Sequence, residues 1–374
     1  MIIMAGKKTG ISRELIIHPG ETIADILEER GITQAELAVQ TGVSAAYVSN
    51  VIAGKKDISS RFAFALEYAL GVPKSFWLNL QANYDAELLE FMESQSITEE
   101  ERQAREALKE VTGYLQKKGI TPADMRGDDL ILALRKALHI SNIGDLKKVI
   151  PTGAFRMAEG ASVDPYVLGA WLRLCETGSD NSGMNNGKIN NGFILDKVSD
   201  LICDLKDVML DETCDLQKEL RTVMAQYGID FSIVKNFRGA PVQGYISFKN
   251  DGVYRMTLTI RRSFADIFWF SLFHELGHII NGDVGRSAKF IDSGSDEEKE
   301  RKADLFAGNC LLEPDAYAEF VKAGDFGIEA IRSFAATQRV MPYIVIGRLQ
   351  REGKLEYSQY AEYKLRYKWA EEKV

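Results

Sequence analysis

The residues best suited to chemistry are His274, Glu275 and His278, which form the pattern His-Glu-x-x-His. Positions i and i+4 of a helix lie one turn apart on the same face, so both imidazoles can converge on one zinc ion. The glutamate between them can act as a general base toward an attacking water. Chance gives this pattern in roughly one chain of this length in a hundred. Here it lies in an apolar segment, where three polar side chains without partners would be costly, so we expect a zinc site.

The third zinc ligand is expected from a second helix downstream, where Glu300 and Asp304 lie one turn apart. Glu300 extends an apolar stripe by one turn, so we predict it as the ligand that leaves the fourth position for water. Asp304 is then placed to accept the second ring N–H of a ligand histidine. The alternative is a solvated acidic helix start. For stabilising the oxyanion, spacing does not choose among Tyr245, Tyr343 and Arg348. The stripe comprises Ala303, Phe306, Ala307, Cys310 and Leu311.

Two motifs of the C-terminal half resemble the ImmA/IrrE family of metallopeptidases. They are Phe268-Trp269-Phe270-Ser271-Leu272-Phe273-His274-Glu275-Leu276-Gly277-His278 and Glu300-x-x-Ala303-Asp304-x-Phe306-Ala307-x-x-x-Leu311-Leu312-x-Pro314. The resemblance implies that His274, His278 and Glu300 bind zinc. It also implies a role, since many family members cleave a partner repressor and release stress, phage or mobile-element genes. Glu313 departs from the family pattern but lies away from the site.

Capping signals near the start of the chain predict a series of short helices. The first begins near Pro19-Gly20 and ends at Gly31, and the capping box Thr33-Gln34-Ala35-Glu36 begins the second. Gly42 ends the second helix in a tight turn, Ser44 caps the third, and Ser59 or Ser60 caps a fourth over 61–70. Two short helices about a glycine turn indicate a helix-turn-helix, whose second helix enters the DNA major groove.

Several polar and small residues of this segment are predicted to contact DNA. Asparagine can bond adenine, an alanine methyl can pack on thymine, and lysines can hold the phosphate backbone. Acidic and basic residues are about equally frequent over 1–80, so a helical bundle that binds protein stays an alternative. We expect His18 to be a local cap or a surface residue. The predicted contact residues are Gln34, Ser44, Ala45, Ala46, Tyr47, Asn50, Lys55 and Lys56.

Residues 18–85 resemble the Cro/C1-type (XRE) helix-turn-helix domain of HigA-like antitoxins. The resemblance rests on His18-Pro19-Gly20-Glu21, Thr33-Gln34-x-Glu36-Leu37-Ala38, Gly42-Val43-Ser44, Asn50-x-x-x-Gly54-Lys55 and Phe76-Trp77-Leu78-Asn79-Leu80-Gln81-x-x-Tyr84. It implies a dimer that binds a palindromic operator and often represses its own operon, in toxin–antitoxin and related settings. A fusion of this domain to an ImmA/IrrE-type peptidase is a recurring arrangement.

The chain is expected to be α+β and mostly α, in three parts. These are a five-helix DNA-binding domain (1–95), a helical connecting region (96–192) with a Gly/Asn-rich loop (177–192), and a zincin-like domain with a small β-sheet (193–374). Asn250-Asp251-Gly252 predicts a hairpin between the last two strands. Gly244 is either a plain sheet glycine or a place where a substrate strand approaches, since such sheets can bind peptide at an edge. The expected helices are 97–118, 130–138, 163–175, 195–210 and 213–227, and the expected strands are 231–234, 242–248 and 253–260.

Composition sets broad limits on function. The 374 residues carry a net charge of −8, which argues against a general nucleic-acid binder. The four cysteines form no C-x-x-C pair, so neither a disulfide framework nor a zinc ribbon is indicated. The sequence shows no signal-peptide pattern and no membrane-spanning run, so we expect a cytoplasmic protein without a membrane partner.

Three functional classes follow. The first is a DNA-binding transcription regulator whose zinc-dependent endopeptidase domain hydrolyses a partner protein, such as a repressor or a toxin–antitoxin component. The second is an antitoxin-like repressor whose zinc site is a non-proteolytic sensor or interaction surface. The third is a metalloenzyme whose helix-turn-helix only dimerises. Glu275 favours the first class, because a purely structural zinc site needs no base. We expect a homodimer, a double-stranded DNA operator and a protein substrate.

Overall fold

The computed structural model describes residues 13–151, 163–177, 192–248, 252–261, 263–284, 289–291 and 297–369. The chain divides into two compact units, Met1–Arg102 with Asp124–Ala133, and Gln103–Ala123 with Leu134–Val374. The connecting region expected at 96–192 is therefore shared between the units, and most of its described residues belong to the second. Of the expected loop 177–192, residues 178–191 lie outside the described residues. The structure is mostly helical and has one small sheet in the described residues.

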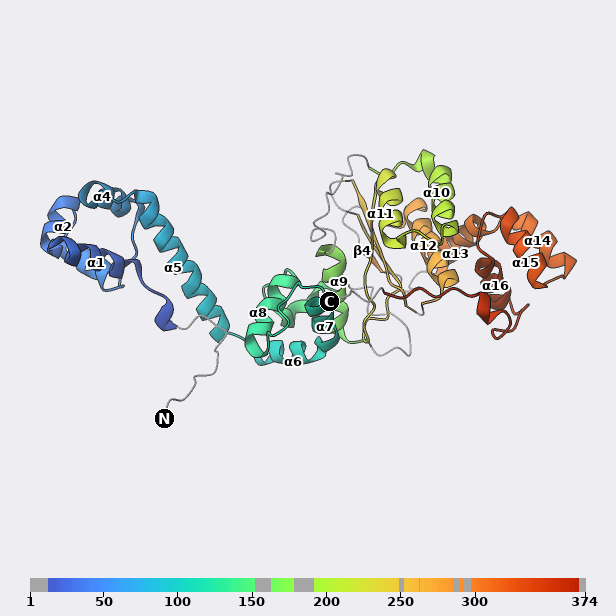
Figure 1. Cartoon of the computed structure of the whole chain (residues 1–374), viewed down its shortest axis with the longest axis horizontal. Coiled ribbons are helices and arrows are strands. Elements are labelled where there is room, and N and C mark those ends of the chain that lie inside the picture. The colour runs from blue at the N-terminus through green and yellow to red at the C-terminus, as the bar shows by residue number, and fades with distance from the viewer. Residues whose placement is uncertain are drawn as a thin grey trace. The chain divides into compact units, whose positions relative to one another are not determined.

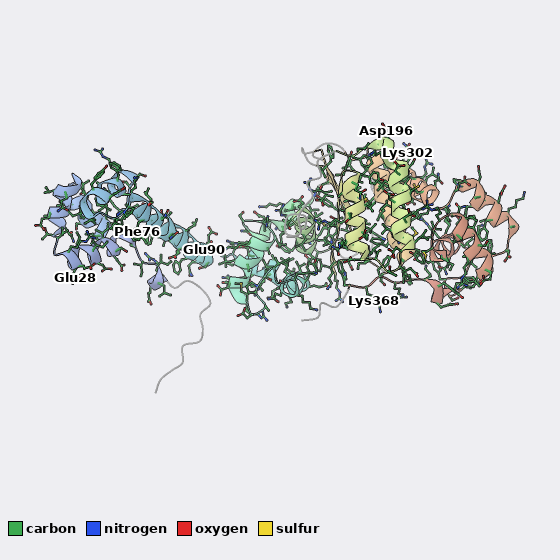
Figure 2. The ribbon with its side chains drawn as sticks, turned by 45° about the horizontal axis from the view of Figure 1, so that its top comes forward. Glu28, Phe76, Glu90, Asp196, Lys302 and Lys368 are labelled. Atoms are coloured by element: carbon green, nitrogen blue, oxygen red, sulfur yellow. The ribbon has the colours of Figure 1, made fainter. Side chains whose placement is uncertain are left out.

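The first unit is a bundle of short helices whose ends follow the sequence signals. The capping box of Thr33 and Glu36 is present at the start of α2, and Gly42 ends that helix in the left-handed conformation, with φ of 67°. Ser59, rather than Ser60, caps α4. Glu28 and Phe76 lie on the surface of this unit (Figure 2). Its elements are η1 (Arg13–Leu15), α1 (Pro19–Arg30), α2 (Gln34–Thr41), α3 (Ala45–Ile52), α4 (Ser60–Leu70) and α5 (Lys74–Gln95).

The core of the first unit collects the apolar face of each helix. Ile23, Leu37 and Val48 have no exposed surface, and the Trp77 ring from α5 is equally buried among them. Burying such side chains stabilises the fold by ~1.5–3 kcal/mol each. This core holds α2 and α3 together, so the surface of α3 is presented by a packed scaffold.

The helices that follow α5 include one departure from the sequence prediction. The single helix expected at 97–118 is two helices, α6 (Glu99–Ala107) and α7 (Lys109–Lys117), with a break at Leu108. The later helices are drawn in Figure 1; the first of them is divided between the two units, and the others belong to the second unit. These later helices are α8 (Gly127–Ala137), η2 (Ile143–Val149), α9 (Pro165–Thr177), η4 (Leu195–Lys197), α10 (Val198–Leu210), α11 (Leu216–Gln226), α12 (Ala265–Ile280), α13 (Glu297–Leu311), α14 (Pro314–Ala323), α15 (Ile328–Thr337), α16 (Pro342–Arg351) and η5 (Ala361–Tyr363).

The sheet of the second unit has the strand order β1-β3-β2-β4. The strands are β1 (Ile229–Ile233), β2 (Gly244–Phe248), β3 (Tyr254–Leu258) and β4 (Lys289–Ile291). β2 and β3 pair antiparallel, as the hairpin signal predicts, with Gly244 opposite Leu258, whereas Asn250 and Asp251 of the predicted turn lie outside the described residues. β1 pairs parallel with β3, and β4 pairs antiparallel with β2. The two central strands are therefore β2 and β3, and β3 is the strand that leads to α12.

Both faces of β2 are covered, which explains why the strand is buried almost throughout. Tyr245 packs edge-to-face on Trp171 of α9 and donates its hydroxyl to Glu176. Ile246, next in the strand, points to the opposite face and belongs to the core that also contains residues of α10, α11 and α12. Figure 1 shows these three helices beside the sheet. Since α9 covers one face of the sheet, the region between 163 and 177 is an integral layer of the second unit and not a separate connector. None of the helices in the described residues is long and apolar enough to cross a membrane.

Candidate functional site

The centre of the site is the crossing of α12 and α13. A methyl group on Gly277 would lie 3.1 Å from Ala303 Cα, so the absence of a side chain lets the two helices come into close contact. At this crossing, Glu300 of α13 faces His274 and His278 of α12. The pattern predicted from two distant motifs is therefore assembled in one place.

The three expected ligand atoms are spaced as a zinc ion requires. His274 Nε2 lies 3.1 Å from His278 Nε2 and 3.2 Å from Glu300 Oε2. His278 Nε2 lies 3.7 Å from Glu300 Oε1. Tetrahedral zinc with bonds of ~2.0–2.1 Å places neighbouring ligand atoms about 3.4 Å apart. The donor set of two imidazoles and one carboxylate thus fits zinc with one position left for another ligand.

Two aspartates fix the direction in which the histidine rings face. His274 Nδ1 donates to Asp304 Oδ1 and His278 Nδ1 donates to Asp283 Oδ2, both at 2.9 Å. Because an ionised carboxylate only accepts, each Nδ1 carries a proton, so in the neutral form of each ring Nε2 holds a lone pair that can bind a metal. With both rings neutral, the two lone pairs and the Glu300 carboxylate would repel one another, and either a proton or a bound cation removes that repulsion.

Of these two aspartates, the sequence pointed to Asp304 and missed Asp283. Gly282, with φ of 74°, turns the chain directly after α12 and brings Asp283 back beneath His278. Asp304 is itself held by Arg351, whose Nη2 donates to its other oxygen at 2.9 Å. The signal for Asp283 was a glycine-aspartate pair just beyond the second histidine.

Titration behaviour reflects the crowding of these groups. Burial disfavours the charged form of His278, but hydrogen bonds to Glu300 and Asp283 outweigh it and raise the pKa of the ring. Burial opposes ionisation of Glu300 as well, yet hydrogen bonds from both histidines lower its pKa to about 2. The hydrogen bond from His274 lowers the pKa of Asp304, and Arg351 adds to this. Glu300 is thus an anion at neutral pH, as a metal ligand must be.

Glu275 is 1% exposed and lies against β2. A Cβ on Gly244 would lie 1.8 Å from Glu275 Oε1 and 2.3 Å from Cδ. The space that any other residue's side chain would fill at position 244 is therefore occupied by the carboxylate of the proposed base. This contact accounts for the glycine at position 244.

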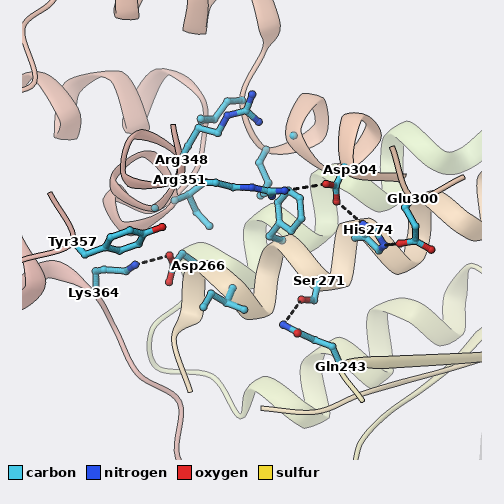
Figure 3. Close-up of a pocket in the computed structure, with 17 residues that line it drawn as sticks. Gln243, Asp266, Ser271, His274, Glu300, Asp304, Arg348, Arg351, Tyr357 and Lys364 are labelled. Carbon is cyan, nitrogen blue, oxygen red and sulfur yellow. Dashed lines mark hydrogen bonds and ion pairs between the residues drawn. The ribbon is translucent and has the colours of Figure 1, made fainter. Parts of the chain in front are cut away.

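A pocket of about 550 Å³ opens beside the metal ligands. Figure 3 shows Arg351 reaching from α16 to Asp304 near the metal ligands, and Lys364 pointing at Asp266 at the other end. The Arg351 guanidinium also lies over the Phe270 ring, 4.8 Å from its centroid. The lining residues are Gln243, Asp266, Ile267, Phe270, Ser271, His274, Glu300, Asp304, Gly308, Leu311, Leu312, Ile344, Gly347, Arg348, Arg351, Tyr357 and Lys364.

The pocket separates the three residues considered for the oxyanion. Arg348 lines it, whereas Tyr245 and Tyr343 do not. The Tyr245 hydroxyl is directed at α9 on the other face of the sheet, and Tyr343 is 2% exposed in the core. Two of the candidates are therefore wrong on position. Arg351, which spacing did not single out, belongs with Arg348 because both project from one face of α16.

Most of the residues predicted to contact DNA lie on α3 or just before and after it. Gln34, Ala45 and Ala46 are exposed, as are Lys55 and Lys56 beyond the helix. Ser44 is exposed as well, but its Oγ accepts the N–H of Tyr47 and caps α3. Asn50 is half-buried, and its carbonyl accepts the N–H groups of Lys55 and Lys56.

Tyr47 is more deeply built into the scaffold than the sequence indicated. Its ring packs edge-to-face on Phe62, and its hydroxyl lies 3.3 Å from Ser59 Oγ. The Lys56 ammonium lies 5.4 Å from the centroid of the same ring. Tyr47 therefore joins α3 to the start of α4 and positions Lys56 at the surface.

His18 is a helix cap, as the sequence suggested, although it is 7% exposed and not a surface residue. Its Nδ1 accepts the N–H of Gly20 at 2.9 Å, and its ring packs edge-to-face on Tyr84. Burial lowers the pKa of His18 below the usual 6.5, although nearby carboxylates partly offset this. The ring is therefore neutral at pH 7, as an accepting cap requires.

Comparison with known proteins identifies the N-terminal part of the chain. Residues 23–77 match the family model described as helix-turn-helix. A curated relative, virulence-associated protein A' of Dichelobacter nodosus, is 41% identical over 69 residues, which is 18% of this chain. The chain spans 60% of the length of that relative. The match thus concerns the first unit.

Three solved structures are similar to a part of the chain. An antidote protein of a plasmid maintenance system from Nostoc punctiforme is 44% identical, covering 19% of this chain and 77% of its own, with a TM-score of 0.18. The antitoxin GraA is 34% identical, covering 20% and 83%, with a TM-score of 0.20. An addiction module antidote protein of a HigA family from Coxiella burnetii is 28% identical, covering 28% and 96%, with a TM-score of 0.19. From the family match, residues 23–77 form a helix-turn-helix domain of the DNA-binding kind.

Proposed function

We propose that this protein is a DNA-binding regulator whose second unit is a zinc-dependent endopeptidase acting on a partner protein. The observation that carries the peptidase half is the facing arrangement of His274, His278 and Glu300, with the carboxylate of Glu275, the neighbour of His274 in the chain, buried against Gly244. A structural zinc site would need no such base and no adjoining pocket. The resemblance to the ImmA/IrrE family, whose motifs include these same residues and their apolar neighbours, supports the same conclusion.

His274, His278 and Glu300 would hold the zinc, which when bound supplies a Lewis acid that polarises the scissile carbonyl. Glu275 takes a proton from the attacking water and passes it to the departing amine. Its burial against Gly244 keeps the carboxylate in one position throughout. Arg348 and Arg351 provide N–H donors in the pocket, where negative charge on the substrate can be stabilised.

The first unit supplies the regulatory half of the proposal. The exposed residues Ala45 and Ala46 begin α3, where a recognition helix meets base edges, and Asn50 lies one turn on. Lys55 and Lys56 follow at the surface, where they can reach phosphates. A homodimer would present two such helices to a palindromic operator. The partner protein would be a repressor or a toxin–antitoxin component, as the family resemblances imply.

The test combines metal content with cleavage in the full-length protein. Wild type should bind about one zinc after dialysis, Glu300→Ala should lose it, and Glu275→Gln should keep it. Incubation with the repressors encoded beside the protein's own gene should yield new N-termini with wild type but not with Glu275→Gln. Zinc-free wild type would overturn the metal centre. A zinc-loaded protein that cuts none of these partners would make the non-proteolytic sensor the better reading.

A further inference from the structure

The pocket beside the metal ligands is lined by three cationic side chains, and two of them are neutralised from within it. Arg351 is paired with Asp304 at 2.9 Å, and Lys364 is paired with Asp266 at 2.7 Å. Both acidic partners line the same pocket. The remaining acid of the lining, Glu300, faces the two histidines.

Arg348 differs, because its carboxylate partner lies outside the pocket lining. Its Nε donates to Glu352, which also accepts the hydroxyl of Tyr317. Glu352 and Tyr317 are not among the residues that line the pocket. Arg348 therefore brings a positive charge to the pocket that no carboxylate of the lining matches.

The Arg348 guanidinium is also held in place before any ligand binds. It lies over the Tyr317 ring, 5.3 Å from the centroid, while Glu352 fixes its Nε. A methyl group on Gly308 would lie 2.6 Å from Nη1, so the missing side chain of this lining residue makes room for the guanidinium. With Nε engaged, the terminal nitrogens form the planar pair that binds a carboxylate through two hydrogen bonds.

We infer that the pocket selects peptides that carry a carboxylate near the scissile bond, with Arg348 as the residue that binds it. This inference rests on the proposed function and names the substrate class of that same site. The pocket wall also has apolar side chains, among them Ile267, Phe270 and Ile344, which suit a hydrophobic side chain beside the acidic group. The carboxylate comes either from an aspartate or glutamate side chain or from the C-terminus of the peptide.

Four zinc-directed probes separate these sources. They are peptidyl hydroxamates of one sequence, with glutamate or glutamine at the tested position and a free carboxylate or an amide at the C-terminus. Binding is measured by calorimetry on the zinc-loaded full-length protein. A charge-assisted Arg–carboxylate contact should make the matching acidic probe bind roughly tenfold to a hundredfold tighter than its neutral partner. A glutamate–glutamine difference identifies a side chain, and a carboxylate–amide difference identifies the C-terminus.

The preference should disappear in Arg348→Gln and persist in Arg332→Gln. Arg332 is the matched control, since it is also a partly exposed helical arginine paired with a glutamate, Glu329, but lies outside the pocket lining. Gly308→Ala should also abolish the preference, because the added methyl group displaces the guanidinium although residue 348 is still arginine. Equal binding of all four probes to wild type, or a preference that survives Arg348→Gln, overturns the inference and leaves the metal centre standing. Failure of every hydroxamate to bind overturns the proposed function as well.

Discussion

Gly244→Ala tests whether the position of the Glu275 carboxylate is what makes this site catalytic. The added Cβ would lie 1.8 Å from Glu275 Oε1, whereas an ordinary contact begins at 3.4 Å. The carboxylate must therefore move by about 1.6 Å, and a misplacement of ~1 Å in an active site can lower the rate about a hundredfold. Gly244 has no positive φ, so alanine is compatible with the backbone itself. We expect kcat/KM for cleavage of the partner protein to fall about a hundredfold while zinc content is unchanged.

The control is Gly113→Ala in α7, a position where a Cβ meets nothing within 4 Å. Alanine inside a helix should stabilise that variant by ~0.5–1 kcal/mol and leave cleavage unaffected. Both variants are assayed for kcat/KM, for bound zinc by elemental analysis and for thermal unfolding. Full activity of zinc-loaded Gly244→Ala would refute the reasoning, since catalysis would then not depend on the position that the Glu275 carboxylate takes beside Gly244. Loss of zinc in the same variant would show that the glycine serves the metal ligands instead.

Three further predictions concern the second aspartate, the buried cap and the DNA contacts. Asp283→Asn should weaken zinc binding about 10- to 100-fold in a chelator competition, because the amide orients the His278 ring less well than a carboxylate, and an unchanged affinity would exclude that role. His18 has a lowered pKa, so the stability it confers is present above pH 6.5 and is lost as the pH falls below that value. His18→Asn keeps an accepting cap without this titration, so its unfolding temperature should fall less between pH 7 and 5 than that of wild type, and parallel curves would argue against the mechanism. Replacing Lys55 and Lys56 with glutamine should weaken operator binding and reduce the salt slope by about 2 in a mobility-shift titration, whereas an unaltered slope would place both lysines away from phosphates.

The sequence predicted best what depends on neighbouring residues. The cap at Thr33, the turn at Gly42 and the hairpin between β2 and β3 each involve groups only a few positions apart, and all three are present. The prediction of a single helix over 97–118 was wrong, because the structure has two helices there. Charged and apolar residues keep helical spacing through this segment, and the break is local to the backbone of Leu108, whose ψ of 14° the spacing does not encode.

The site was predictable as far as one helix determines it. His274, His278 and Glu300 keep fixed offsets on their helices, so their faces could be assigned in advance. Whether Tyr245, Tyr343 or Arg348 reaches the pocket depends on which face of a strand or helix meets α12, and that is decided by packing. The strand β4 has only three residues, too few for a periodic signal, and Asp283 needs a turn to reach His278.

Glycines at the site explain why the positions of its charged side chains were hard to predict from the sequence. The missing side chain of Gly244 makes room for Glu275, and that of Gly308 makes room for Arg348. Gly347 does the same for Asp266, whose Oδ2 would lie 2.4 Å from an added Cβ. In a helix, each such glycine costs ~1 kcal/mol relative to alanine. At these positions stability is given up for space, so alanine at Gly308 or Gly347 should stabilise its helix while displacing the charged group that the pocket needs.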